Sequence, residues 1–326
     1  MVDVLSSLVL RDEAGEAATT IDHWFLFQYG KREVPTALFN KIVIFGVGLI
    51  GGSFALALRH AGLARRIVGV GRSRANLDLA MQRGLVDEAG TDAVAVQDAD
   101  LVLLAIPVGQ MGAAMAAMVP HLAAHAIVTD AGSTKQDVVA LARRHLGMHL
   151  ARFVPAHPIA GSEQTGAGAA QADLYQDKNV IMTPLAETDR EALARVTQAW
   201  RACGARVLEM TPPQHDAVFA AVSHLPHVLA FALVDMIAAQ PNREQLLQFA
   251  ASGFRDFTRI AGSSPEMWRD IALANRDALL VQLGNYQDEL GQLRRLLEAG
   301  DGASLYELFA RASAVRNAWA EERNND

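Results

Sequence analysis

The chain has 326 residues, of which 51% are hydrophobic and 20% charged, and its formal net charge is −7. This length suffices for about two domains with cores of their own. The acidic balance, without a basic stripe interleaved with aromatic residues, argues against nucleic acid as a partner. The single cysteine, Cys203, excludes an internal disulfide and a zinc site built on cysteine pairs.

The targeting signals also limit the class of protein. The N-terminus has no basic segment before an apolar run, which argues against a signal peptide. No apolar run looks long enough for a membrane span, so we expect no membrane partner. These features predict a soluble cytoplasmic enzyme.

The first 38 residues do not join the pattern that follows them. They contain an aromatic cluster, HWFLFQYG, at residues 23–30. One interpretation is a flexible arm, or translated sequence upstream of the natural start. The other is an arm that packs on a neighbouring subunit.

Strands and helices alternate from residue 39 to residue 213. The predicted strands lie within residues 41–48, 66–72, 99–108, 126–133, 152–158, 179–184 and 205–213, and the predicted helices within 51–62, 74–84 and 189–204. Continuously apolar strands between helices are typical of a parallel sheet that is covered on both faces. We therefore predict an α/β fold with a Rossmann-type dinucleotide-binding domain over residues 39–213.

Residues 214–326 have a different sequence pattern, with apolar residues every three to four positions and few β-branched clusters. This pattern predicts an all-helical domain. Its first helix, within residues 214–238, is apolar nearly all round, as expected of a helix buried among others or in a subunit interface. We expect a homodimer built through this domain.

The segment FGVGLIGGS carries the strongest motif of the chain. Gly46, Gly48 and Gly51 form G-x-G-x-x-G directly after a strand and at the start of a helix. Such glycines permit a tight turn, close approach of a pyrophosphate and close packing of helix on strand. Leu49 and Ile50 supply N–H groups at the start of the helix. Ile106 and Pro107 end another strand at the same edge of the sheet. We predict a dinucleotide site at these residues.

The end of the second strand indicates which dinucleotide binds. Enzymes that use NAD usually carry an acid there, which binds the ribose 2′-hydroxyl. Gly71 stands in that place and is followed by Arg72, Ser73 and Arg74. Because arginine binds a phosphate and an acid repels it, NADP is favoured over NAD. The alternative is that both arginines are solvated and that either cofactor is used.

Two further strand ends carry polar residues. Ser133, in TDAGSTK, is either a helix N-cap or a group that orients a substrate hydroxyl beside the nicotinamide. Lys135 is interpreted as a surface charge rather than a cofactor contact. His157 follows the next strand and suits a proton acceptor near neutral pH. Although a lone histidine is more often structural, its place at the same sheet edge as Ser133 favours catalysis.

Polar residues in the helical domain point to a ligand cleft. Ser223, His224 and His227 lie on successive turns of an apolar helix and need partners. No carboxylate pair or H-E-x-x-H accompanies the histidines, so we expect no metal site. Arg255 and Arg259 are four apart, which places them on one helical face. They either belong to a solvated face or bind an anionic substrate.

Together these motifs resemble the prephenate/arogenate dehydrogenase family of tyrosine biosynthesis. The resemblance covers about residues 40–290 and rests on GVGLIGGSFALAL, DAGSTK, HPIAGSE, VSHLPH, DFTRIA and MWRD, in the family's order. It implies a nucleotide-binding domain followed by a helical dimerisation domain, with the substrate in the cleft between them. It also implies NAD(P)-dependent oxidative decarboxylation of a cyclohexadienol.

The resemblance also implies roles for individual residues. His157 matches the base that takes the hydroxyl proton, Ser133 the serine that orients the hydroxyl and the cofactor, and Arg259 the arginine that holds the ring carboxylate. The other implied substrate-pocket residues are Arg255, Ser223, His224, His227, Glu163 and Trp268. Gly71 and Arg72 depart from the acidic pattern of the NAD-using members.

Two other functions stay open at this point. One is a different two-domain dehydrogenase, of the β-hydroxyacid or imine reductase type, although those enzymes typically rely on a lysine or aspartate in the helical domain. The other is a dinucleotide sensor without catalysis, in which Ser133, His157 and Arg259 converge by accident. Within the resembled family, the sequence does not decide between prephenate and arogenate.

Overall fold

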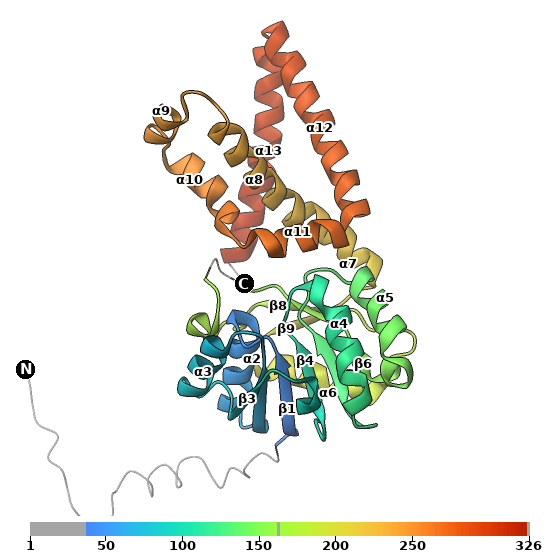
Figure 1. Cartoon of the computed structure of the whole chain (residues 1–326). Helices are drawn as coiled ribbons and strands as arrows, with labels where there is room; N and C mark the ends of the chain where they lie inside the picture. Colours follow the sequence, from blue (N-terminus) through green and yellow to red (C-terminus); the bar gives the residue numbers. More distant parts are fainter. Residues whose placement is uncertain (1–36, 162–163, 325–326) are drawn as a thin grey trace, which may run out of the picture.

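The computed structural model describes residues 37–161 and 164–324. Residues 1–36 of the expected N-terminal arm and Glu163 therefore lie outside the described residues. A sheet domain (residues 37–211) carries a helical domain (residues 212–324) on one side of its strands (Figure 1). This arrangement confirms the predicted fold class.

Six parallel strands form the main sheet, in the order β3-β2-β1-β4-β5-β6. The strands are β1 (Phe39–Phe45), β2 (Ala64–Val70), β3 (Glu88–Gly90), β4 (Leu101–Leu104), β5 (Ile127–Asp130) and β6 (Phe153–Val154). This is the 3-2-1-4-5-6 order of dinucleotide-binding sheets. The strand order reverses between β1 and β4, and ligands bind in such sheets outside the carboxyl ends of the strands at that point.

Helices cover both faces of this sheet. Ile42 and Ile44 of β1 pack into a core with α2 and α6, whereas Val43 and Phe45 pack into a second core with α4 and α5. Strand residues alternate between the two faces, so every position of β1 from Ile42 onward is apolar. The helices are α2 (Leu49–His60), α3 (Arg74–Gln82), α4 (Val108–Met118), α5 (Gln136–His145) and α6 (Arg190–Ala202).

The sequence predicts one strand over residues 152–158, and this prediction is wrong in its detail. The structure divides the segment at Pro155 into β6 and β7 (Ala156–Pro158), which belong to different sheets. Proline has no N–H for the strand ladder, so it separates the two short strands. A second sheet has the order β7-β8-β9, with β8 at Asn179–Met182 and β9 at Arg206–Glu209, and β7 runs antiparallel to β8. His157 consequently lies on β7.

The helical domain begins where two prolines follow a cap. Thr211 and Gln214 form a capping box, with Pro212 at the first helical position, where a missing N–H costs no hydrogen bond. The helices are α7 (Pro212–Phe219), α8 (Leu225–Ala238), α9 (Arg243–Gln248), α10 (Ser252–Thr258), α11 (Pro265–Ala274), α12 (Arg276–Ala299) and α13 (Gly302–Asn324). In Figure 1, α12 and α13 stand beside each other and rise away from the sheet domain.

A π-helical turn (Ala220–His224) joins α7 to α8, so that one helix runs from Pro212 to Ala238. Pro226 does not break it. The wider π turn directly before Pro226 relieves the clash between the proline ring and the carbonyl of Val222, four residues earlier. By length and composition this helix could cross a membrane, the one such helix in the part of the chain that the structure describes. The expectation that no apolar run is long enough is therefore wrong.

Candidate active site

Glycines shape the turn between β1 and α2. Gly46 has a φ of +89°, and a Cβ there would lie 2.2 Å from the carbonyl oxygen of Ala105. A Cβ on Gly51 would lie 2.2 Å from the carbonyl oxygen of Gly46, so only glycine lets α2 pack this closely on β1. Gly48 instead faces open space, because the nearest atom to a Cβ there is the nitrogen of Gly166, 3.9 Å away. The turn therefore leaves its middle glycine accessible to a ligand.

The N-terminus of α2 offers its N–H groups to an anion. Gly48 is the N-cap, no side chain caps the helix, and the first turn contains no acidic residue. The free N–H groups and the helix dipole both favour a phosphate. Leu49 is buried and Ile50 half-buried, and both lie in the first turn of α2, where their backbone N–H groups have no partner within the helix. The residues of the turn thus fit a dinucleotide.

Ile106 lies beside the glycine turn, and Pro107 follows it in the chain. A Cβ on Gly46 would lie 3.0 Å from Cγ2 of Ile106, and Pro107 is the N-cap of α4. Both residues are half-buried. They follow β4, the strand next to β1 at the point where the strand order reverses.

The residues after β2 have separate tasks. The hydroxyl of Ser73 caps α3 by accepting a hydrogen bond from the backbone N–H of Asn76 at 3.3 Å. Arg74 pairs with Asp78 at 3.0 Å. Arg72 is exposed in this loop.

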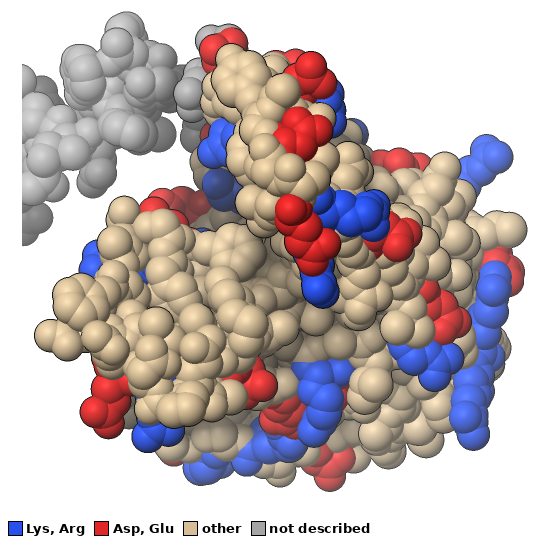
Figure 2. Space-filling model, turned by 90° about the horizontal axis from the view of Figure 1, so that it is seen from above, with Lys and Arg blue, Asp and Glu red and all other residues tan. Residues whose placement is uncertain are grey.

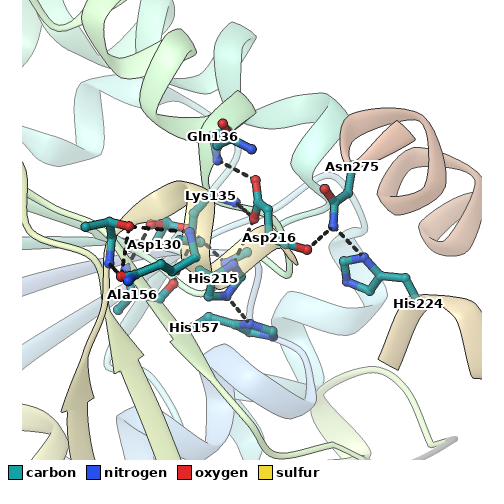
Figure 3. A network of polar contacts seen from close by, with 12 residues as sticks. Asp130, Lys135, Gln136, Ala156, His157, His215, Asp216, His224 and Asn275 are labelled. Atoms are coloured by element: carbon teal, nitrogen blue, oxygen red, sulfur yellow. Dashed lines mark hydrogen bonds and ion pairs between the residues drawn. The ribbon is translucent and has the colours of Figure 1, made fainter. Parts of the chain in front are cut away.

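A chain of three buried side chains connects the two domains (Figure 3). Nδ1 of His157, on β7, lies 2.8 Å from Nε2 of His215, on α7. Nδ1 of His215 lies 2.8 Å from Oδ1 of Asp216. His157 is 9% exposed, whereas His215 and Asp216 are at most 1% exposed. Of the three, His157 is the residue that a ligand can reach.

Burial governs the ionisation of His157 and His215 and opposes that of Asp216. It lowers the pKa of His157 well below the ordinary value, and neighbouring His215, Lys135 and His224 lower it further. Burial also lowers the pKa of His215, against the hydrogen bond to Asp216, which raises it. Both imidazoles are therefore neutral near pH 7. Burial opposes ionisation of Asp216, but hydrogen bonds from His215 and from two backbone N–H groups hold its pKa below the usual value.

Lys135 is fully buried, so the interpretation of this residue as a surface charge is wrong. Its Nζ pairs with the buried carboxylate of Asp130 and donates to the carbonyl of Ala156 at 2.8 Å. The other oxygen of Asp130 accepts the N–H of Ala156 at 3.2 Å. A buried lysine needs such partners because an unpaired charge in the interior is costly. The pair fixes the backbone immediately before His157.

Ser133 does not cap a helix. Helix α5 begins at Gln136, and its first N–H groups are taken by the carboxylate of Asp216, which accepts from Lys135 N at 2.8 Å and from Gln136 N at 2.9 Å. This cap comes from the other domain. Ser133 is half-buried just before it, and its backbone lies against His224, whose pKa it raises. Of the two interpretations of Ser133, the structure removes the N-cap.

His224 completes the buried cluster from the helical domain. Its Nδ1 lies 3.0 Å from Nδ2 of Asn275, which also donates to the carbonyl of Asp216 at 2.8 Å. Because Nδ2 of Asn275 is a donor, Nδ1 of His224 accepts and Nε2 carries the proton. Burial lowers the pKa of His224 to about 4.

His227 and Trp268 form a stacked pair next to this cluster. Their ring centroids are 3.6 Å apart at an interplanar angle of 19°, and Nδ1 of His227 bonds the carbonyl of Ser223 at 2.9 Å. Burial lowers the pKa of His227, and the charge of Arg259 lowers it further. Neither Nε1 of Trp268 nor Nε2 of His224 has a hydrogen-bond partner of good geometry among the described residues, although the backbone of Ser133 lies near the His224 ring. Such buried polar atoms are typical of a wall that a polar ligand completes.

The two arginines lie on different elements. Arg255 is on α10, which ends at Thr258, and Arg259 begins a short 3₁₀ turn (Arg259–Gly262). Both side chains are exposed. The electrostatic effect of Arg259 on His227 places it beside the stacked pair, whereas no such link ties Arg255 to the cluster in the described residues.

Sequence reasoning missed several residues of the cluster, namely Asp130, Lys135, His215, Asp216 and Asn275. One pattern could have found two of them. His215 and Asp216 are polar and adjacent in a helix whose other residues are largely apolar, and such residues need partners. As for metals, no group of three His, Cys, Asp or Glu side chains is placed to hold an ion in residues 37–161 and 164–324.

Comparisons with known proteins agree with this architecture. The family model "Prephenate dehydrogenase, nucleotide-binding domain" matches residues 54–209, and "Prephenate dehydrogenase, dimerization domain" matches residues 211–311. A cyclohexadienyl dehydrogenase of Zymomonas mobilis is 38% identical over 282 residues, which cover 86% of this chain and 96% of that protein.

Two solved structures are also similar. The prephenate dehydrogenase of A. aeolicus, in complex with hydroxyphenyl propionate and NAD+, has a TM-score of 0.80 and 37% identity, and the match covers 85% of this chain and 97% of the other. The arogenate dehydrogenase of Synechocystis has a TM-score of 0.71 and 33% identity, with 86% and 99% covered.

Proposed function

The chain belongs to the prephenate dehydrogenase family, and we propose that His157 is the proton acceptor of its reaction. It is an NAD(P)-dependent oxidoreductase of tyrosine biosynthesis that oxidatively decarboxylates prephenate, arogenate or both. The observation that carries the proposal is the state of His157. It is neutral, bonded through Nδ1 to His215, and its Nε2 has no hydrogen-bond partner in the described part of the chain. That nitrogen is also not among the fully buried polar atoms.

The chemistry requires a base at one atom of the substrate. The nicotinamide, when bound, accepts a hydride from the ring carbon that carries the hydroxyl group. As the hydride leaves, Nε2 of His157 accepts the hydroxyl proton, and the carbon–oxygen bond becomes a carbonyl. The ring carboxylate then departs as carbon dioxide, and its bonding electrons make the ring aromatic and turn the carbonyl into a phenolate, which takes the proton back from Nε2 of His157. Because aromatisation drives this loss, the residues need only bind, orient and move one proton.

Further residues orient the substrate for this step. We propose that Ser133, freed from capping α5, holds the hydroxyl beside His157, and that Arg259 binds the ring carboxylate. A guanidinium suits that task because it bonds a carboxylate through two parallel N–H groups. Ser223, His224, His227 and Trp268 would form the remaining wall of the pocket, and we propose Arg255 and Glu163 as further contacts of the substrate.

The cofactor is expected to be NADP rather than NAD. Arg72 is exposed after β2, and no acid stands at the end of that strand to bind a ribose 2′-hydroxyl. Gly46, Gly48 and Gly51, with the N–H groups at the start of α2, would hold the pyrophosphate, and Ile106 and Pro107 would lie beside the nicotinamide half. Binding of either dinucleotide at this turn follows from the same uncapped helix end.

We also propose that the chain is a cytoplasmic homodimer through its helical domain. Large apolar side chains of α12 and α13 are exposed in the single chain, among them Leu290, Phe309 and Val315. Broad parts of the face in Figure 2 carry neither Lys, Arg, Asp nor Glu. A second copy of the chain would cover the apolar Pro212–Ala238 helix as well, which accounts for its composition without a membrane.

The test of function is a four-way assay. Prephenate and arogenate are each offered with NAD and with NADP, and reduced cofactor is followed by its absorbance. Turnover of either substrate, faster with NADP, is the expected result. Binding of NADPH without turnover of any pair would support a dinucleotide sensor instead.

A further inference from the structure

The chain His157–His215–Asp216 crosses from one domain to the other. His157 comes from β7, and the other two residues come from the first two turns of α7, some 58 residues further along. Both links measure 2.8 Å, which is a good hydrogen-bond distance. The three groups therefore have a definite set of donors and acceptors, which can be worked out from the carboxylate.

The carboxylate of Asp216 is held as an acceptor. Its Oδ1 accepts the N–H of Lys135 and its Oδ2 accepts the N–H of Gln136, both at the N-terminus of α5, where the helix dipole favours an anion. An ionised carboxylate has no proton to donate, so the proton on the His215–Asp216 link belongs to Nδ1 of His215. The neutral His215 ring then has a lone pair on Nε2.

The same reasoning extends to His157. Nε2 of His215 accepts, so Nδ1 of His157 carries the proton of that link. A neutral His157 with its proton on Nδ1 has its lone pair on Nε2, the nitrogen without a partner in the described residues. The carboxylate thus sets the tautomer of a ring that it does not touch.

We propose that His215 and Asp216 are positioning residues, which fix His157 in the tautomer that is basic at Nε2 and stabilise its imidazolium. This inference rests on the proposed role of His157 as the base. When Nε2 of His157 takes the hydroxyl proton, its Nδ1–H still donates to His215, and Asp216 supplies the negative charge at the end of the chain. The proton moves from the hydroxyl oxygen to Nε2, and no N–H bond of His157 or His215 is broken.

The other charges around the chain do not supply this stabilisation. Lys135 faces both imidazoles but is paired directly with Asp130, so the two largely cancel. His224 also faces His157 and is neutral above a pH of about 4. Asp216 is the remaining charge next to the two rings among the described residues.

Asp216 also has a structural task, since it caps α5, and the experiment must separate the two. In Asp216→Asn one amide oxygen still accepts from the backbone of α5, and the amide nitrogen that replaces the other oxygen donates. If it donates to Nδ1 of His215, both tautomers invert and Nε2 of His157 becomes protonated and inactive as a base. Asp137→Asn is the matched control, because Asp137 lies in the first turn of the same helix and does not contact His215.

Two measurements decide the outcome. Nitrogen-15 NMR of selectively labelled histidine reports the tautomer of His157 at pH 8, in protein without substrate, and the chain has ten histidines to resolve. Steady-state kinetics report kcat and KM. For Asp216→Asn we expect an inverted tautomer and a kcat lowered by about 10²–10⁴-fold, as for a base held in the wrong tautomer, with KM changed by less than about threefold.

His215 provides variants that leave the cap on α5 in place. His215→Phe should lower kcat by about 10²-fold or more and give His157 a mixed tautomer. His215→Gln, whose amide can accept from His157 and donate to Asp216, should retain more activity than His215→Phe. These two variants decide the question if Asp216→Asn does not fold.

The proposal is overturned if Asp216→Asn or His215→Phe keeps the tautomer of His157, whatever happens to kcat, because a loss of rate would then come from disturbed packing. A kcat within about threefold of the unaltered enzyme would overturn it as well. Failure of the proposed function looks different. In that case the unaltered enzyme turns over neither substrate, while the NMR comparison still reports the tautomer.

Discussion

The two domains of this protein differ in how far they bury their apolar side chains. In the sheet domain all four residues of β4 are fully buried, and two cores lie on either side of the main sheet. In α13 of the helical domain, Tyr306 is 75% exposed and Val315 72%. The sheet domain is therefore complete by itself, whereas the helical domain leaves apolar surface of the kind that marks an interface.

The contrast extends to polar groups. The sheet domain presents His157 and the glycine turn at its edge, but the residues that orient His157 come from α7 of the helical domain. The helical domain in turn depends on the sheet domain, because the carboxylate of Asp216 is satisfied by N–H groups of α5. The site thus needs both domains, although both large apolar clusters of the described residues lie in the sheet domain.

The largest effect is expected at the reactive residue of the complete domain. His157→Asn should lower kcat by about 10²–10⁴-fold with little change in KM, because a general base is lost while the pocket stays. Initial rates from the absorbance of reduced cofactor measure this. His149→Asn, which alters another buried histidine of the same domain, should leave kcat unchanged. A near-normal kcat for His157→Asn would remove this residue from the role.

The proposed dimer interface of the helical domain is tested by placing a charge on the exposed apolar face of α13. Val315→Asp should raise the dissociation constant of the dimer by about 10²-fold or more, because the interface would have to bury an unpaired carboxylate. Light scattering over a range of protein concentrations measures this. Val94→Asp, which adds the same charge to an exposed valine of the sheet domain, is the control. Unchanged association of Val315→Asp would place the interface elsewhere.

We expect substrate binding to depend on Arg259, from the helical side of the site. Arg259→Ala should raise KM for the substrate by about 10–10²-fold, the range for a lost hydrogen bond to a charged group, with a smaller effect on kcat. Arg143→Ala serves as the control, since Arg143 is exposed and paired with Glu187 at 3.1 Å. An unaltered KM would contradict the proposed contact with the ring carboxylate.

We expect the choice of cofactor to depend on Arg72 of the sheet domain. Arg72→Ala should raise KM for NADP by about tenfold and leave KM for NAD nearly unchanged, because only NADP has a 2′-phosphate. Arg74→Ala should have less effect on NADP, as Arg74 is already paired with Asp78. Equal losses with both cofactors would refute a role for Arg72 in recognising the phosphate.

The smallest effect concerns the pH dependence of stability at the junction of the domains. Burial lowers the pKa of His157, His215, His224 and His227 below the value of 6.5 that they have when unfolded. The unfolded chain therefore binds more protons below that pH, so the free energy of unfolding falls as the pH decreases from about 6.5 towards 4. Denaturant titrations at several pH values measure this. His224→Asn should reduce the slope, and a flat profile between pH 7 and 5 would contradict the assignment.

Local patterns in the sequence predict much of the fold. Apolar runs, helical spacing and the three glycines act over a few residues, so they indicate the sheet domain, its glycine turn and the helical domain without knowledge of the tertiary structure. The family resemblance adds candidate residues such as His157 and Arg259. Local patterns do not predict the split of residues 152–158 at Pro155 or the continuity of the Pro212–Ala238 helix. Each depends on how segments distant in the sequence pack against it.

The polar contacts at the site were decided by the tertiary structure alone. The sequence suggests that Lys135 is a surface charge, whereas the structure pairs it with the buried Asp130. His215 lies 58 residues from His157, the histidine that it orients. The sequence by itself determines which side chains are donors, acceptors or apolar, because these are properties of single residues. Which donor meets which acceptor depends on how strands and helices distant in the chain pack together. The tautomer of His157 belongs to this second class, because it is set by Asp216 across the junction of the two domains.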